Sequence, residues 1–293
     1  MNDIDLVAEG HWPAERLDAD YQPRGTVSAE RFTAEMAAYR AVSDQMRGPW
    51  GRRLDVVYDT ASGQRLDLFG PERMEACPVF VFLHGGYWRA LSKRDSAMMA
   101  GMLAMQGIAT AVVEYDLAPS VSLAEITRQV RAAVAFLWKE GGQLGLDSHR
   151  IHVGGSSAGG HLAGMVLAGG WQTELWLPED VVKSGLPISG LFDLSPIRAS
   201  APQEWLSLTE ADVAALSPLR HLPQAGPTLT LAWAETDPAG FKRQSAAFAA
   251  AWRATGAQVS CLEVPGRNHF DILMELCDAD TPLSRALLGM IRG

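Results

Sequence analysis

Short apolar segments alternate with amphipathic ones along most of this chain, and this alternation limits the folds that it can adopt. The apolar segments are rich in β-branched residues and predict strands at 79–83, 109–113, 151–153, 186–189, 229–233 and 259–264. The amphipathic segments predict helices at 95–106, 123–138, 158–168, 241–252 and 284–291. Apolar strands that alternate with helices form a mostly parallel sheet with helices on both faces. The sequence therefore predicts an α/β fold.

The first fifty residues are polar and predict an N-terminal extension with a helix that packs on the main body. Apolar side chains from Phe32 to Met46 favour one face of a helix, Ser28 can cap its start, and Gly48 and Pro49 are expected to end it. Two short strand-like segments around a glycine turn then predict a β-hairpin at 54–58 and 66–69. We therefore expect an extension over residues 1–50 and one α/β domain over 51–293.

Composition and charge exclude several kinds of partner. The net charge is −9 without a Lys/Arg cluster, so we expect no nucleic-acid partner. No apolar run of about 20 residues occurs and no secretory signal is visible, so we expect no membrane partner and a cytoplasmic location. Cys77, Cys261 and Cys277 lack the spacing of a zinc site or a disulfide framework and are expected to be packing residues. The oligomeric state stays open, a homo-oligomer included.

Residues 155–159 read Gly-Ser-Ser-Ala-Gly, which is a G-x-S-x-G pattern centred on Ser157. A predicted strand precedes the pattern and a predicted helix follows it, as in a nucleophile elbow. The glycines permit a sharp turn that exposes the serine hydroxyl at the start of the helix. The bare pattern also fits an ordinary Gly-Ser turn, but its position favours Ser157 as a nucleophile.

Residues 84–88 read His-Gly-Gly-Tyr-Trp and follow the predicted strand at 79–83. Two glycines after a strand let the backbone direct N–H groups toward a substrate oxygen, so Gly85 and Gly86, with Ala158, are candidate oxyanion donors. The alternative is a glycine turn that carries two buried aromatic side chains. His84 lies on this loop and is expected to hydrogen-bond to neighbouring loops.

The acid and the base of such a hydrolytic site follow the nucleophile in the chain. His269 lies on a loop after the predicted strand at 259–264 and is the best-placed histidine for the base. Asp237 follows the strand at 229–233 and could orient the imidazole. On the residues alone, Asp193 and Glu235 remain alternatives for the acid.

As a set, these motifs resemble the serine-hydrolase type of arylformamidase, which is the kynurenine formamidase family of the α/β-hydrolase fold. The resemblance rests on residues 84–88, on Glu-Tyr-Asp-Leu-Ala-Pro at 114–119, on the serine elbow, on D-x-x-x-F-x-R-Q-S from Asp237, and on Asn-His-Phe-Asp at 268–271. It extends from about Tyr21 to the last residue and implies a triad of Ser157, Asp237 and His269. The sequence departs from the family pattern at Ser156 and Gly240, where relatives have a histidine and an acidic residue.

The resemblance implies hydrolysis of a formyl amide of an arylamine, such as N-formylkynurenine, through an acyl-enzyme, without a metal or a cofactor. A carboxylesterase acting on short-acyl esters and an inactive hydrolase-fold binding protein are the alternatives. Aromatic side chains near the motifs are expected to line the site of a small-molecule substrate. They are Tyr87, Trp88, Phe192, Trp205 and Phe270.

Overall fold

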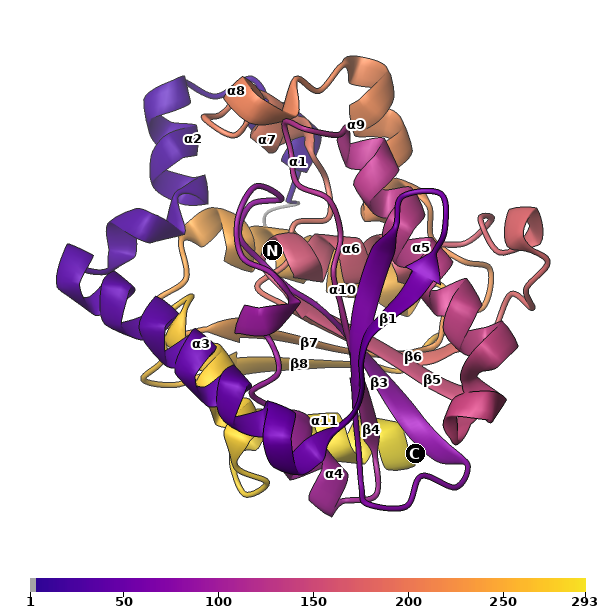
Figure 1. The fold of residues 1–293 in the computed structure, drawn as a ribbon. Helices are drawn as coiled ribbons and strands as arrows, with labels where there is room; N and C mark the ends of the chain where they lie inside the picture. Colours follow the sequence, from indigo (N-terminus) through magenta and orange to yellow (C-terminus); the bar gives the residue numbers. More distant parts are fainter. Residues whose placement is uncertain (1–3) are drawn as a thin grey trace.

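The computed structural model describes residues 4–293, and its centre is an eight-stranded sheet (Figure 1). The strands are β1 (Gly51–Asp59), β2 (Gln64–Phe69), β3 (Cys77–Leu83), β4 (Ala109–Val113), β5 (Leu146–Ser156), β6 (Val182–Ile188), β7 (Thr228–Ala234) and β8 (Val259–Val264). Their order in the sheet is β1-β2-β4-β3-β5-β6-β7-β8. β2 pairs antiparallel with both β1 and β4, and the other pairs are parallel. The predicted hairpin and the mostly parallel sheet are confirmed.

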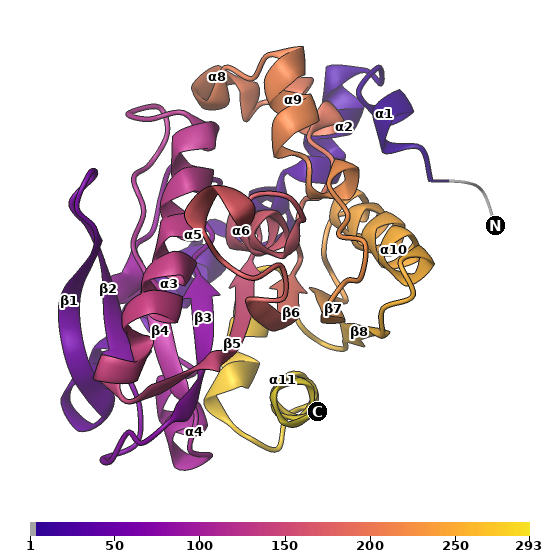
Figure 2. The same cartoon turned by 90° about the vertical axis from the view of Figure 1, so that its right-hand side faces the viewer.

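Helices cover both faces of the sheet (Figure 2). One face carries α5 (Leu123–Glu140), α6 (Ala158–Leu167) and α10 (Ala239–Ala254), and the other carries α3 (Ala29–Trp50), α4 (Ala100–Met105) and α11 (Pro282–Arg292). Alternate side chains of β3 point to opposite faces of the sheet. Val79 and Val81 pack in the core on the α5, α6 and α10 side, and Phe80 and Phe82 pack in the core on the α3, α4 and α11 side. Burial on both faces is the reason that the central strands are continuously apolar.

Five short helices lie at the top of Figure 1, near the loops that follow the carboxyl ends of the strands. They are α1 (Leu6–Glu9), α2 (Ala14–Tyr21), α7 (Ser195–Arg198), α8 (Gln203–Leu206) and α9 (Glu210–Leu216). We call this group the cap. The sequence did not predict these helices, because each spans at most eight residues and shows too few turns to establish a periodic pattern.

Two predicted helix boundaries were wrong. α3 continues through Gly48 and Pro49 to Trp50, because a proline in the last turn removes one hydrogen bond and the Gly51 N–H still donates to the Arg47 carbonyl. The helix predicted at 95–106 begins only at Ala100. Residues 93–95 form a separate 3₁₀ turn, in which the Asp95 carboxylate accepts from Arg40 and from Ser92.

The three cysteines differ in their exposure to solvent. Cys77 is buried, but Cys261 and Cys277 are exposed, so the predicted packing role is wrong for these two. Cys261 is exposed because it lies on β8, which is an edge strand of the sheet.

Within residues 4–293, no helix combines the length and the apolar character that crossing a membrane requires.

A buried ion-pair cluster docks the C-terminal half of α3 on the sheet. Arg47 on α3 donates to the fully buried Asp67 carboxylate at 2.5 Å. The Lys93 ammonium lies 2.7 Å from Asp67 and 2.6 Å from Asp55. Because Asp67 is buried, removing either cation would leave one positive charge for the two carboxylates of Asp55 and Asp67, which would weaken the attachment of this end of α3.

Two buried histidines predict a loss of stability in mild acid. Burial lowers the pKa of His152 and of His161 to about 4, because desolvation disfavours the charged imidazole. As the pH falls from about 6.5 to 4, the unfolded chain takes up protons that the folded protein excludes. The free energy of unfolding should therefore fall in this window, by at most about 3 kcal/mol for each histidine.

Urea denaturation at about pH 7 and about pH 5 measures this loss. His161→Gln should show a weaker pH dependence, because glutamine does not titrate and can still donate to the Leu216 carbonyl, which the imidazole contacts at 2.7 Å. His11→Gln is the control at an exposed position and should keep the full dependence. An unaltered dependence in His161→Gln would contradict the assignment.

Candidate active site

Ser157 occupies a strained turn between β5 and α6. Its φ and ψ angles are 58° and −118°, which lie outside the regions that a non-glycine residue prefers. Glycine is required on either side, since a Cβ on Gly155 would lie 2.3 Å from the Gly159 carbonyl oxygen and one on Gly159 would lie 2.0 Å from the Leu83 oxygen. The Ser157 N–H donates to the Ile188 carbonyl at 2.8 Å. The backbone thus holds the serine at the wall of a pocket.

Asp237 and His269 follow the neighbouring strands β7 and β8, and their side chains meet at the edge of the sheet. His269 Nδ1 lies 2.6 Å from Asp237 Oδ1. The other carboxylate oxygen accepts from Ser189 Oγ at 2.6 Å and from the Ala234 N–H at 2.9 Å. Three donors therefore fix a buried carboxylate, which in turn orients the imidazole.

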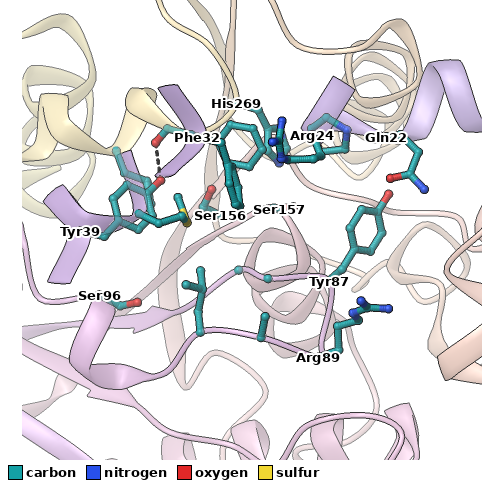
Figure 3. A pocket seen from close by; sticks show the side chains of 18 of the residues that line it. Gln22, Arg24, Phe32, Tyr39, Tyr87, Arg89, Ser96, Ser156, Ser157 and His269 are labelled. Atoms are coloured by element: carbon teal, nitrogen blue, oxygen red, sulfur yellow. Dashed lines mark hydrogen bonds between the residues drawn. The ribbon is translucent and has the colours of Figure 1, made fainter. Parts of the chain in front are cut away.

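His269 lines the same cavity as Ser157 (Figure 3). His269 Nε2 is buried and has no hydrogen-bond partner among the described residues. The Phe241 ring lies edge-on to the imidazole, with 4.8 Å between ring centroids, and limits its rotation. An unpartnered nitrogen in this position can accept a proton from a hydroxyl in the pocket.

The alternative acids are engaged elsewhere. Asp193 pairs with Arg220 at 2.9 Å and accepts from the Ser195 N–H. Glu235 accepts from the Gly266 N–H at 2.6 Å. Since neither carboxylate contacts His269, the geometry favours Asp237.

The loop after β3 lies against the Ser157 turn. A Cβ on Gly85 would lie 2.9 Å from the Ser156 carbonyl oxygen, and one on Gly86, where φ is +98°, would lie 2.2 Å from the Ala90 oxygen. Because a side chain would clash at either position, both positions require glycine. Within residues 4–293, the N–H groups of Gly85, Gly86 and Ala158 have no protein acceptor. They are therefore free to donate to a substrate oxygen beside the serine.

His84 is buried beneath this loop. Its Nδ1 lies 2.9 Å from the Gly85 carbonyl oxygen, and its Nε2 lies 3.3 Å from the Glu114 carboxylate. The ring stacks on Tyr115 at 4.0 Å, and the Tyr115 hydroxyl donates to the His84 carbonyl. These contacts fit the loop-bracing role predicted for His84.

A cavity of about 580 Å³ is lined by Ser157 and His269 and by five aromatic residues. Three of the aromatic residues predicted for the site, Tyr87, Trp205 and Phe270, line it. Trp205 on α8 also donates to the Tyr87 carbonyl at 3.0 Å, so the cap and the loop after β3 form one wall. Phe32 and Tyr39 on α3 form the opposite wall (Figure 3).

The structure contradicts the prediction for Trp88 and Phe192, which lie in the core and not in the pocket lining. Trp88 is fully buried beneath its loop and lies edge-on to His161, with 5.0 Å between ring centroids. Phe192 is fully buried and stacks on Phe248 at 4.1 Å. Both were misassigned because proximity in sequence to a site does not fix the direction of a side chain.

The sequence did not predict that the N-terminal segment lines the pocket. Gln22, Pro23 and Arg24 lie at the cavity directly after α2. Arg243 on α10 holds this segment by ion pairs to Glu9 at 2.5 Å and to Asp20 at 2.6 Å. A signal was present, because Arg243 belongs to the R-Q-S part of the family pattern that begins at Asp237.

Both departures from the family pattern lie near this site. A Cβ on Gly240 would lie 2.5 Å from the Asp20 carbonyl oxygen and 2.7 Å from the Tyr21 ring. The absence of a side chain therefore lets α2 pack directly on α10. Ser156 is buried and contributes to the pocket lining beside Ser157.

The strand order, the strained serine turn and the pocket beyond the strands define an α/β hydrolase. A family model described as BD-FAE matches residues 66–183. An esterase from Pyrobaculum calidifontis has the same fold, with a TM-score of 0.74 at 17% identity over 89% of this chain and 92% of that one. A thermophilic carboxylesterase from a metagenomic library gives 0.73 at 19% identity over 91% and 97%.

Curated relatives narrow the class to one family. The kynurenine formamidase of Danio rerio is 32% identical over 282 residues, which cover 94% of this chain and 91% of that protein. The kynurenine formamidase of Salmo salar is 31% identical over 88% of each chain. The chain belongs to the kynurenine formamidase family. It is a hydrolase of an amide or an ester.

Proposed function

We propose that this protein is a serine hydrolase that removes the formyl group from an N-formyl arylamine, with N-formylkynurenine as the representative substrate. One observation carries the proposal. A strained serine, an unpartnered imidazole nitrogen and aromatic walls share one cavity. Membership of the kynurenine formamidase family supports the formamide, and the cytoplasmic location stays a prediction.

The geometry supports an acyl-enzyme mechanism. His269 Nε2 takes the Ser157 proton while Ser157 Oγ attacks the formyl carbon. The oxyanion accepts from the N–H groups of Gly85, Gly86 and Ala158. His269 then protonates the arylamine nitrogen, the C–N bond breaks, and water releases formate by the reverse sequence. Asp237 keeps the proton on Nδ1 and stabilises the imidazolium.

Two arginines at the cavity favour a substrate that carries a carboxylate. Arg24 and Arg89 both line it together with Glu204, and within the described residues neither arginine forms an ion pair, although Arg24 donates to the Val27 carbonyl at 3.0 Å. Their guanidinium groups lie over aromatic rings, Arg24 over Phe32 at 4.6 Å and Arg89 over Trp205 at 4.1 Å. Unpaired guanidinium groups at an apolar pocket are suited to bind a carboxylate, such as the one on the amino-acid part of N-formylkynurenine.

The second candidate is a carboxylesterase for short-acyl aryl esters. Two observations favour it. The triad and the oxyanion donors do not distinguish an ester oxygen from an amide nitrogen as leaving group. A plant relative, a probable isoprenylcysteine alpha-carbonyl methylesterase of Oryza sativa, is 26% identical over 75% of this chain and 57% of that protein. The aromatic walls would accept an aryl group in either case.

A substrate panel tests the proposal. We expect kcat/KM for N-formylkynurenine and for short-acyl aryl esters to exceed that of matched alkyl esters about ten- to hundredfold, because burying an aromatic ring contributes about 1.5 to 3 kcal/mol. Efficiency should fall as the acyl chain lengthens. Equal efficiency for aryl and alkyl leaving groups, or a rise toward long acyl chains, would contradict the aromatic pocket and favour a general esterase.

An Arg24→Ala variant sharpens the panel. It should raise KM about tenfold or more for N-formylkynurenine and leave neutral formanilide nearly unaffected, because only the former has a carboxylate to lose a charge-assisted contact. Arg16→Ala is the matched control, since Arg16 stacks on Trp12 in the cap and is not part of the pocket lining. An equal rise in KM for both substrates would show that Arg24 does not bind the substrate carboxylate.

A further inference from the structure

The loop that carries His269 is tied to the chain after β7 mainly at its start, where the Gly266 N–H donates to Glu235 at 2.6 Å and the Thr236 N–H donates to the Arg267 carbonyl at 3.1 Å. It follows β8, which is an edge strand, and only Val264 of that strand is buried. Among residues 4–293, no further strand pairs with the outer side of β8. The base must nevertheless be held within a fraction of an ångström for proton transfer. Other elements therefore have to fix this loop.

Helix α3 supplies contacts to the residues on either side of His269. The Tyr39 hydroxyl donates to the Phe270 carbonyl. The Asn268 side-chain amide donates to Glu35 Oε1 at 2.8 Å. Figure 3 shows Tyr39 at the wall of the cavity, with its hydrogen bond drawn as a dashed line. Helix α3 is thus hydrogen-bonded to the residue before His269 and to the residue after it.

Asn268 links α3 to the backbone of the loop and thereby fixes the conformation of residues 268–271. Its side-chain oxygen accepts from the Phe270 N–H at 2.8 Å and from the Asp271 N–H at 3.1 Å. Its own backbone N–H donates to Asp271 Oδ1 at 2.7 Å. A side chain that closes the turn around His269 is therefore itself held by Glu35.

The contacts between α3 and the loop differ in how much they contribute to stability. Arg31 also reaches the loop, at 3.0 Å from Asp271, but 55% of its side chain is exposed, so this ion pair contributes little. Tyr39 is 4% exposed, and only 12% of the Glu35 side chain is exposed. Burial raises the pKa of Tyr39, so its hydroxyl remains a donor at any pH at which the enzyme is folded.

We propose that Glu35 and Tyr39 are positioning residues for the base, which hold residues 268–271 so that His269 Nε2 faces Ser157. The proposal rests on the proposed function, because it requires His269 to act on Ser157. It gives the N-terminal extension a catalytic purpose. The sheet positions the nucleophile and the acid, Asp237 orients the imidazole, and α3 holds the chain on either side of it.

Ion pairs in the C-terminal half of α3 make it possible to test the proposal without detaching the helix. Arg47 and Arg40 attach the helix through Asp67 and Asp95, and neither contact involves the His269 loop. Changes at Glu35 or Tyr39 should therefore leave α3 docked and the melting temperature within a few degrees of wild type.

The test compares Tyr39→Phe, Glu35→Ala and Glu35→Gln in the full-length protein. The readouts are kcat and KM and the rate at which a fluorophosphonate labels Ser157, which reports activation of the serine whatever the natural substrate is. Tyr39→Phe and Glu35→Ala should lower kcat and the labelling rate about ten- to hundredfold and change KM less than about threefold. Glu35→Gln keeps an acceptor for Asn268 and should restore most of the rate. Asp44→Asn, which breaks an exposed ion pair of the same helix with Arg94, should behave as wild type.

Labelling of Tyr39→Phe and Glu35→Ala at the wild-type rate would overturn the proposal and leave the serine mechanism intact. Equal losses in Glu35→Gln and Glu35→Ala would overturn the role of the Asn268 contact. A wild-type protein that fluorophosphonate does not label would overturn the proposed function, and the positioning role with it.

Discussion

Replacing Ser157 with alanine is expected to lower kcat/KM by about 10⁴-fold or more on every substrate that the enzyme hydrolyses, because no covalent intermediate can form. The fold should be retained, since the Ser157 N–H and not its hydroxyl makes the bond to the Ile188 carbonyl. Initial rates with N-formylkynurenine, together with intact-mass analysis after fluorophosphonate treatment, measure both consequences.

The neighbouring serine provides a matched control. Ser156 precedes Ser157 and also lies at the pocket, but its hydroxyl plays no part in the mechanism. Ser156→Ala should therefore still be labelled at one site. Activity of Ser157→Ala within about tenfold of wild type would remove Ser157 from the mechanism.

Loss of the acid or of the base should be nearly as severe. Asp237→Asn should lower kcat about 10⁴-fold, because an asparagine amide favours the wrong imidazole tautomer, and His269→Ala should remove the base altogether. Combining either change with Ser157→Ala should add little, because the three residues act as one unit. Steady-state kinetics of the single and double variants measure this.

Asp193→Asn separates the two candidate acids. Asp193 pairs with Arg220 and not with His269, so its loss should lower the melting temperature and leave kcat within about threefold of wild type. A severe loss of kcat in Asp193→Asn beside a mild loss in Asp237→Asn would show that the acid was misassigned.

Much of this architecture could be predicted from local patterns. The run 151–153, the glycines around Ser157 and the helix that follows belong to one continuous segment, and steric limits on a strand-to-helix turn leave few conformations open to it. His269 was found in the same way, because the end of a strand in a parallel sheet points to a common edge.

Side-chain direction could not be predicted in this way. Tyr87 and Trp88 are adjacent in the chain, yet the first lines the pocket and the second is fully buried on His161. Both residues have positive φ angles, of 52° and 58°, so the loop follows neither helical nor strand geometry. The direction of each ring depends on which neighbours leave room for it.

Local patterns were enough to predict the α/β sheet, the serine turn and the order of the three polar residues, since these depend on periodicity and on backbone geometry within a few residues. The residues that surround them could be identified only in the folded protein. Glu35 and Asn268 are 233 positions apart, and Arg243 and Glu9 are 234 apart. Such contacts form when whole elements pack, and their free energy depends on burial and distance that no local pattern contains. The N-terminal extension therefore shows its part in the site only in three dimensions.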